Sequence, residues 1–381
     1  FDEKGQLTDH EITESIICSD RRMTYTEADQ YFRYCLTGSC ELSGEVLAEL
    51  APLGEMLDGM KELAGILHEK RRSRGSIDFD LPESRIILDE QGRTADIVPR
   101  RRTQATEMIE DFMLIANETV AEEYYWQELP FLYRVHEEPD PKKIHELNSL
   151  LKTMGKSLRR HGGELQPGDM QKLLAQLEDT PDEDFISRLA LRSMKQARYS
   201  EDNLGHFGLA DKYYCHFTSP IRRYPDLQIH RIIRENLAGR LDGERISHYH
   251  EILQDVAGKT SRTERRAVEA ERTVTKLKMS QYMEAHLGAV YEGIITGVKR
   301  WGLYVELPNT IEGLIRVTSL NDDYYRLDEE KYELAGERHG RRYRLGERIR
   351  VVVSGVDTIA HVVEFEEEGA DGKRQYQTDR Q

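Results

Sequence analysis

The sequence is poor in the features that mark membrane proteins, disulfide-rich proteins and zinc proteins. No apolar run approaches the ~20 residues needed to cross a bilayer. Four cysteines in 381 residues are too few for a disulfide scaffold, and they lack the paired spacing and the neighbouring histidines of a zinc site. They are Cys18, Cys35, Cys40 and Cys215. We therefore expect a protein of the reducing cytoplasm.

The chain also lacks an initiating methionine. It begins at Phe1, and its first ten residues, FDEKGQLTDH, resemble neither a signal peptide nor the start of a helix. We expect it to be a piece of a longer protein, entered midway through a strand or loop. Its length predicts two or three domains, and its hydrophobic content of 38% excludes a disordered chain.

Apolar spacing in the first part of the chain predicts both helices and strands. Residues 46–67 carry a stripe at steps of three and four, in which Pro52 kinks or starts the helix. Cations and then Gly75 follow, as is typical of a helix C-terminus. A hairpin is expected to turn at Gln91-Gly92, and a second helix is expected over residues 107–125.

The middle of the chain is predicted to be mainly helical. Residues 130–141, PFLYRVHEEPDP, indicate a strand running into a turn, and two or three helices are expected from there to Ser200. Pro225 occupies a typical first position of a helix. Ser261-x-x-Glu264 has the pattern of a capping box, so a long helix is expected from about Ser261 to His286.

The pattern changes after Gly288, where short alternating strands are separated by turns that contain glycine. This predicts a small all-β barrel over residues 287–366, followed by a polar tail over residues 367–381. The fold class is therefore α+β, with a helix-rich first domain over residues 1–286 that also contains some strands.

Charge is distributed unevenly. Residues 188–240 hold ten Lys or Arg against five acidic residues, a net charge of +5 in a chain of −16. A basic island in an acidic protein indicates that a polyanion binds at a particular place. A solvated helix face of mixed charge is the alternative.

Two adjacent arginines lie within this basic island. Arg222 and Arg223 follow a Ser-Pro turn and precede the helix that begins near Pro225. Guanidinium groups beside a helix N-terminus form a natural phosphate site. One arginine of the pair could instead form a structural ion pair with Asp226 or Glu235.

Glu271 is a second candidate. Its helical neighbours Ala267 and Val274 predict a semi-apolar stripe, on which a buried carboxylate would require an arginine partner. The alternative is a surface glutamate on a charge-rich helix.

The predicted barrel contributes a third signal. Trp301 and Tyr304 flank Gly302 on an early strand, and arginines that include Arg341 and Arg342 cluster before the last strands. Aromatic faces beside cations are typical of single-stranded nucleic-acid binding on an OB-fold barrel. Trp301 as a core side chain is the alternative.

Several segments together resemble the RNB family of processive 3′-to-5′ exoribonucleases, and within it the bacterial ribonuclease R group. The most specific segment is HFTSPIRRYPDL, and the resemblance extends to about residue 366. The other segments are RGSIDFDLPESRIILDE, EDFMLIANETVAE, PFLYRVHEEPDP, LRSMKQARYS and ERRAVEAER, followed by a barrel of the ribosomal protein S-one type.

The resemblance implies roles for particular residues. Phe79 matches an aromatic side chain that clamps the terminal bases, and Tyr25 matches a tyrosine that sets the length of the final product. Arg222 matches the arginine that grips the phosphate at the active site, and Glu271 matches the glutamate behind it. Glu110 matches an acidic residue near the 3′-terminal nucleotide.

The resemblance also implies a cofactor that this chain cannot hold in the family's way. The family binds Mg²⁺ through closely spaced aspartates, and no such run occurs here, so we expect those ligands upstream of Phe1. In the intact protein an Mg²⁺-activated water would release nucleoside 5′-monophosphates from single-stranded RNA. We expect the isolated chain to bind RNA, as a monomer, but not to cleave it. A non-catalytic RNA-binding protein or scaffold is the alternative, and ribosomes or RNA-decay proteins are open as partners.

Overall fold

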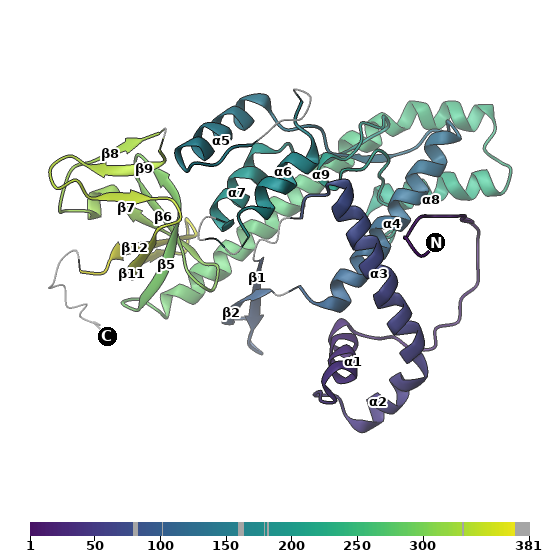
Figure 1. The fold of residues 1–381 in the computed structure, drawn as a ribbon, viewed down its shortest axis with the longest axis horizontal. Helices are drawn as coiled ribbons and strands as arrows, with labels where there is room; N and C mark the ends of the chain where they lie inside the picture. Colours follow the sequence, from purple (N-terminus) through teal and green to yellow (C-terminus); the bar gives the residue numbers. More distant parts are fainter. Residues whose placement is uncertain are drawn as a thin grey trace.

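The computed structural model describes residues 1–78, 83–100, 102–158, 164–178, 180, 183–329 and 331–369. A helical part is followed by a β-barrel, and a long helix runs from one to the other (Figure 1). Within these residues no helix is both long enough and apolar enough to span a membrane. The helices are α1 Tyr25–Thr37, α2 Gly44–Leu50, α3 Gly54–Arg74, α4 Gln104–Trp126, α5 Pro141–Thr153, α6 Pro167–Ala175, α7 Glu183–Ser193, α8 Tyr224–Leu237 and α9 Gly243–Glu284.

The strands form a barrel and three smaller sheets. Hairpin β1–β2 turns at the predicted place, where Gly92 has a positive φ of 75°. The strands are β1 Glu83–Leu88, β2 Thr94–Arg100, β3 Tyr133–Val135, β4 Arg198–Ser200, β5 Val290–Lys299, β6 Gly302–Glu306, β7 Glu312–Arg316, β8 Tyr325–Asp328, β9 Glu333–Gly336, β10 Arg342–Arg344, β11 Arg348–Asp357 and β12 Val362–Glu367.

The predicted helix over residues 46–67 is interrupted at Pro52, where a 3₁₀ turn separates α2 from α3. Helix α3 ends at Gly75, which has a φ of 101°. A Cβ atom there would lie 2.9 Å from the backbone of Gly168, so both the conformation and the close approach require glycine.

The predicted start of the long helix at Ser261 is wrong. Helix α9 begins at Gly243, where Asp242 caps it, and Ser261 is buried in its middle. The Ser261 hydroxyl accepts a hydrogen bond from the Tyr199 backbone N–H (3.0 Å) and donates one to the Ala257 carbonyl (2.8 Å). Its side chain therefore fastens α9 to β4, a strand that the sequence analysis did not predict.

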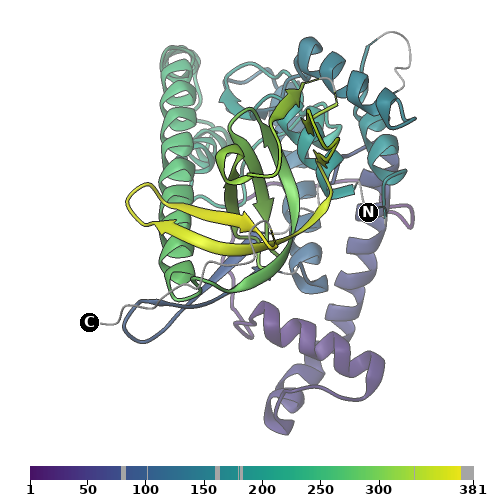
Figure 2. The same cartoon turned by 90° about the vertical axis from the view of Figure 1, so that its left-hand side faces the viewer.

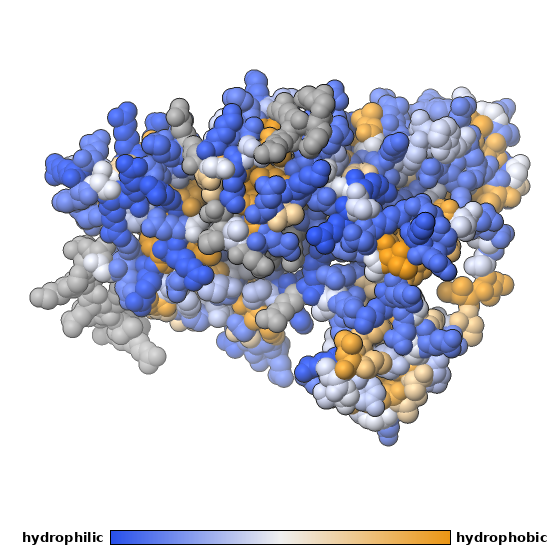
Figure 3. Space-filling model, in the orientation of Figure 1, coloured by the Kyte–Doolittle hydropathy of each residue, from blue (hydrophilic) through white to orange (hydrophobic). Residues whose placement is uncertain are grey.

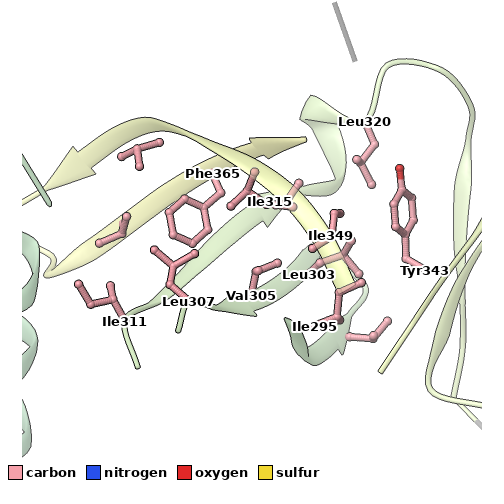
Figure 4. Close-up of a cluster of buried hydrophobic side chains, with 14 of the residues drawn as sticks. Ile295, Leu303, Val305, Leu307, Ile311, Ile315, Leu320, Tyr343, Ile349 and Phe365 are labelled. Atoms are coloured by element: carbon pink, nitrogen blue, oxygen red, sulfur yellow. The ribbon is translucent and has the colours of Figure 1, made fainter. Parts of the chain in front are cut away.

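The barrel closes in the order β11-β12-β7-β6-β5, and β12 pairs in parallel with β7. A closed five-stranded barrel of this kind is an OB fold, as predicted. Its interior is filled by aliphatic side chains and Phe365 (Figure 4). Figure 2 shows the barrel with α9 alongside it.

Hairpin β1–β2 joins the helical part to the barrel. Ile97 of β2 belongs to the barrel core, and the hydroxyls of Ser84 and Thr310 are 2.6 Å apart. Arg188 of α7 donates two hydrogen bonds of 2.7 Å to the Glu306 carboxylate of β6. The barrel is therefore packed against the helical part rather than attached only through the end of α9.

Candidate nucleic-acid interface

The two adjacent arginines of the Ser-Pro turn before α8 differ in their contacts. Arg223 forms an ion pair with Asp226 (2.7 Å), whose side chain is fully buried. This is the structural ion pair that the sequence left open. Arg222 is exposed, and its guanidinium makes no hydrogen bond or ion pair within the residues that the structure describes.

The segment that leads into this turn is held between α4 and α8. The amide of buried Asn117 donates a hydrogen bond to the Tyr214 hydroxyl (3.1 Å) and accepts one from the Phe217 backbone N–H (2.9 Å). On the other side, His230 bonds to the Phe217 carbonyl (2.9 Å) and its ring stacks on Phe217. Asn117 was not among the residues that the sequence analysis selected.

The charges of three arginines act on the half-buried His216. Its Nδ1 lies 2.9 Å from the Tyr199 hydroxyl. Burial, followed by the charges of Arg223 and Arg134 and more weakly that of Arg222, lowers the pKa of His216 to about 2. The imidazole is therefore neutral at ordinary pH, and the positive charge at this place comes from the arginines.

Arg134 is also matched by an acid. It pairs with Glu264 of α9 (2.7 Å), and its guanidinium lies over the Tyr199 ring, 4.7 Å from the centroid. Arg134 was not among the residues that the sequence analysis selected, although it lies in the PFLYRVHEEPDP segment. Its position depends on the pairing of β3 with β4, which local pattern does not show.

Glu271 does not occupy the buried position that was expected. It is exposed, and Val274 beside it is 55% exposed, so the predicted semi-apolar stripe is wrong. Within the described residues Glu271 forms no ion pair with Arg222. Glu264, seven residues earlier and on the same helix face, forms the ion pair with an arginine instead.

Glu271 lines a groove of about 580 Å³ between α9, β1 and the barrel. The groove also contains Arg272 and Lys276 of α9 and Tyr304 of the barrel. The structure thus brings together a predicted catalytic residue and a predicted RNA-stacking residue. The groove and the Arg134–Glu264 pair lie on one length of α9, because Glu264 and Glu271 are ~10 Å apart along the helix axis.

Of the two aromatic candidates of the barrel, Trp301 is exposed and Tyr304 is half-buried. Trp301 is 57% exposed, which rules out the alternative of a core side chain. Its indole N–H donates a hydrogen bond to the Tyr304 hydroxyl (3.2 Å). The exposed Trp301 ring is accessible to a stacking partner.

The arginine candidates of the barrel already have acidic partners. Arg341 pairs with Glu367 and lies 3.7 Å from Asp322. Arg342 pairs with the buried Glu333 (2.8 Å). Their charges are compensated within the barrel, so they offer less to a phosphate than the sequence suggested.

The remaining candidates lie around α1, α3 and α4. Tyr25 begins α1, is 51% exposed and lines an apolar hollow of about 560 Å³. Figure 3 shows hydrophobic residues gathered on the surface around α1 and α2.

Glu110 is bridged by Arg102 to Asp78, the residue before Phe79. Phe79 itself lies outside the described residues.

A half-buried acid pair, Glu118 and Asp211, was not selected from the sequence. Arg74 bonds to Glu118 (2.8 Å) and lies 3.4 Å from Asp211. Burial raises the pKa of the Asp211 carboxyl to about 8, helped by a hydrogen bond to Glu118 and by its charge. Glu118 directly follows Asn117 in the EDFMLIANETVAE segment, which was the available signal.

The described residues do not fit the magnesium site that the resemblance implied. Among them, no three or more His, Cys, Asp or Glu side chains are grouped so as to hold a metal ion.

Comparison with known proteins agrees with this fold. The RNB domain family matches residues 1–239, and the S1 RNA binding domain matches residues 284–361. The chain belongs to the RNB family. Its relatives include ribonuclease R 1 of Lactococcus lactis, 40% identical over 95% of this chain and 44% of that protein. Ribonuclease R of Aquifex aeolicus is 41% identical over 96% of this chain and 50% of that protein.

Solved structures share the architecture. Mycoplasma genitalium RNase R, in complex with ribose-methylated single-stranded RNA, matches with a TM-score of 0.81 and 26% identity over 89% of this chain and 52% of that chain. Yeast Ssd1, described as a pseudonuclease, matches with a TM-score of 0.57 and 19% identity over 81% of this chain and 38% of that chain. The chain spans about half the length of the ribonuclease R proteins it matches.

Proposed function

We propose that this chain is the RNA-holding part of a processive 3′-to-5′ exoribonuclease that degrades single-stranded RNA to nucleoside 5′-monophosphates. The observation that carries the proposal is Arg222, an exposed and unpaired guanidinium on a turn fixed by buried contacts, within the described part of an RNB chain. A guanidinium on a fixed turn beside a helix N-terminus suits a phosphate whose charge grows in the transition state.

The likeness of the barrel to S1 domains supports a path for the RNA. Bases would stack on Trp301 and Tyr304, and phosphates would meet Arg272 and Lys276 in the groove along α9. From there the strand would follow α9 past the Arg134–Glu264 pair toward Arg222. In this arrangement Glu271 lies on the path, and it does not orient Arg222.

Magnesium would be held by ligands outside the described residues, and cleavage would require the longer protein. A second function is a non-catalytic binder of single-stranded RNA, which would use the exposed Trp301 and the groove along α9 without a cleavage step. Yeast Ssd1, which has a similar fold, is described as a pseudonuclease. Digestion of single-stranded RNA with Mg²⁺ by the longer protein separates the two functions, because the binder releases no nucleotides.

Arg222→Ala tests the role of the turn. In the longer protein we expect it to lower kcat on single-stranded RNA by about 10²–10³-fold, because one preorganised charge is lost from the transition state. RNA affinity should fall only a few-fold. Arg240→Ala is the control, because this exposed arginine follows the far end of α8. Equal loss of kcat and affinity, or no loss of either, would contradict a catalytic role.

A further inference from the structure

Asp226 is fully buried, and its two carboxylate oxygens differ in the hydrogen bonds that they accept. Its Oδ1 accepts three hydrogen bonds, from the Ser219 backbone N–H (2.8 Å), the Arg223 Nε (3.1 Å) and the Arg223 Nη2 (2.7 Å). Its Oδ2 is buried and has no partner within the described residues. All of the directed contacts of this carboxylate therefore go to one tight turn.

These contacts hold the turn at both ends. Ser219 begins it and Arg223 ends it, and a single carboxylate oxygen binds both. The backbone N–H groups of Arg222 and Arg223 both donate to the Ser219 carbonyl (3.3 and 3.1 Å). The backbone of Arg222 is thereby fixed, while its side chain extends into solvent.

The same carboxylate decides which arginine carries uncompensated charge. Arg223 is only 20% exposed and is neutralised by Asp226, as Arg134 nearby is neutralised by Glu264. Of the three arginines whose charges act on His216, only Arg222 has no acidic partner in the part of the chain that the structure describes.

We propose that Asp226 is a positioning residue that selects Arg222 from the adjacent arginine pair. It fixes the turn and cancels the charge of Arg223, so that an RNA phosphate meets one guanidinium rather than two. This inference rests on the proposed RNA-binding function and sharpens it, because it assigns Arg223 to the scaffold and Arg222 to the phosphate.

The salt dependence of binding counts phosphate contacts and distinguishes this role from a merely structural one. For single-stranded RNA each contact contributes ~0.7 to the slope of log K against log salt concentration. We measure binding of a labelled single-stranded RNA to the chain, for the wild type and for R222Q, D226N and R223Q/D226N. R240Q is the matched control.

The proposal predicts a distinct outcome for each variant. R222Q should flatten the slope by about 0.7, and R240Q should not change it. D226N leaves a carbonyl for the Ser219 N–H but frees the Arg223 charge, so its slope should steepen by about 0.7. This is a roughly 2.5-fold greater loss of affinity between about 50 and 200 mM salt. R223Q/D226N should return the slope to that of the wild type.

Two results would overturn this inference and leave the proposed RNA-binding function standing. A flatter slope in R223Q/D226N would show that Arg223 already contacts phosphate in the wild type. An unchanged slope in D226N, with a folded protein by circular dichroism, would show that Asp226 does not silence Arg223. If D226N fails to fold, the comparison of R222Q with R223Q/D226N still decides. A wild type without salt-dependent RNA binding would instead refute the proposed function, and this inference with it.

Discussion

At the scale of single side chains, the raised pKa of Asp211 predicts a pH dependence of stability. Asp211 shares Arg74 with Glu118, so one guanidinium faces two carboxylates. If both acids ionised, a net negative charge would be buried. The raised pKa of Asp211, about 8, reflects its burial and the neighbouring carboxylate.

Asp211→Asn should therefore change how stability depends on pH. An unfolded aspartate ionises near pH 4, so between about pH 4 and pH 8 the folded wild type binds the extra proton and loses stability as pH rises. The variant lacks this group, so its free energy of unfolding relative to wild type should rise by up to about 1.4 kcal/mol per pH unit from pH 5 to pH 8. Urea unfolding across that range measures it.

Asp202→Asn, at an exposed aspartate, is the control and should follow the wild-type curve. Curves for Asp211→Asn and the wild type that stay parallel from pH 5 to pH 8 would show that Asp211 is already ionised at the lower pH.

The sequence identified the candidate residues better than their partners. Arg222 and Arg223 are adjacent residues of the same type. Only the ion pair of Arg223 with the buried Asp226 distinguishes them. Glu264 and Glu271 lie on the same face of α9, and only the pairing of β3 with β4 places an arginine beside the first. Residue type and spacing predict the chemistry of a site. Contacts between distant segments decide which of two residues of the same type takes part in it.

At the level of elements, Ser261 shows how one side chain can join two of them. It lies in the middle of α9, and its hydroxyl satisfies the backbone N–H of Tyr199 in β4. Ser261→Ala should destabilise the protein by about 1–3 kcal/mol, because a buried N–H loses its partner. Urea unfolding at constant pH measures the difference.

Thr263→Ala is the matched control, because Thr263 is exposed and its hydroxyl bonds only within α9. It should change stability by less than about 0.5 kcal/mol. Equal effects of the two substitutions would mean that the contact with β4 contributes nothing.

Elements with local signals were predicted, and those that depend on distant partners were missed. Pro52 interrupts a helix, Gly75 ends one and Gly92 turns a hairpin, because each acts on its own backbone. Strand β4 has three residues and exists through its pairing with β3, more than 60 residues away. The Ser-x-x-Glu pattern at Ser261 has the local form of a helix start, but its hydroxyl is used by another element.

At the scale of the whole molecule, the barrel and the helical part share buried surface. Ile97, from a hairpin that precedes the barrel by about 190 residues, is 2% exposed in the barrel core. Tyr332 and Leu345, between barrel strands β7 and β11, pack against the core of α5–α7. Shared cores of this kind predict that the two parts unfold together.

Ile97→Ala tests this coupling. It should destabilise the protein by about 2–4 kcal/mol, because it leaves a cavity in the barrel core. The chain has two tryptophans, Trp126 on α4 and Trp301 on the barrel, so Trp126→Phe and Trp301→Phe each leave one reporter of a single part. In both backgrounds Ile97→Ala should shift the urea midpoint of tryptophan fluorescence by the same amount. A shift seen only through Trp301 would mean that the barrel unfolds independently. The β1–β2 hairpin would then pack on the barrel without coupling its unfolding to that of the helical part.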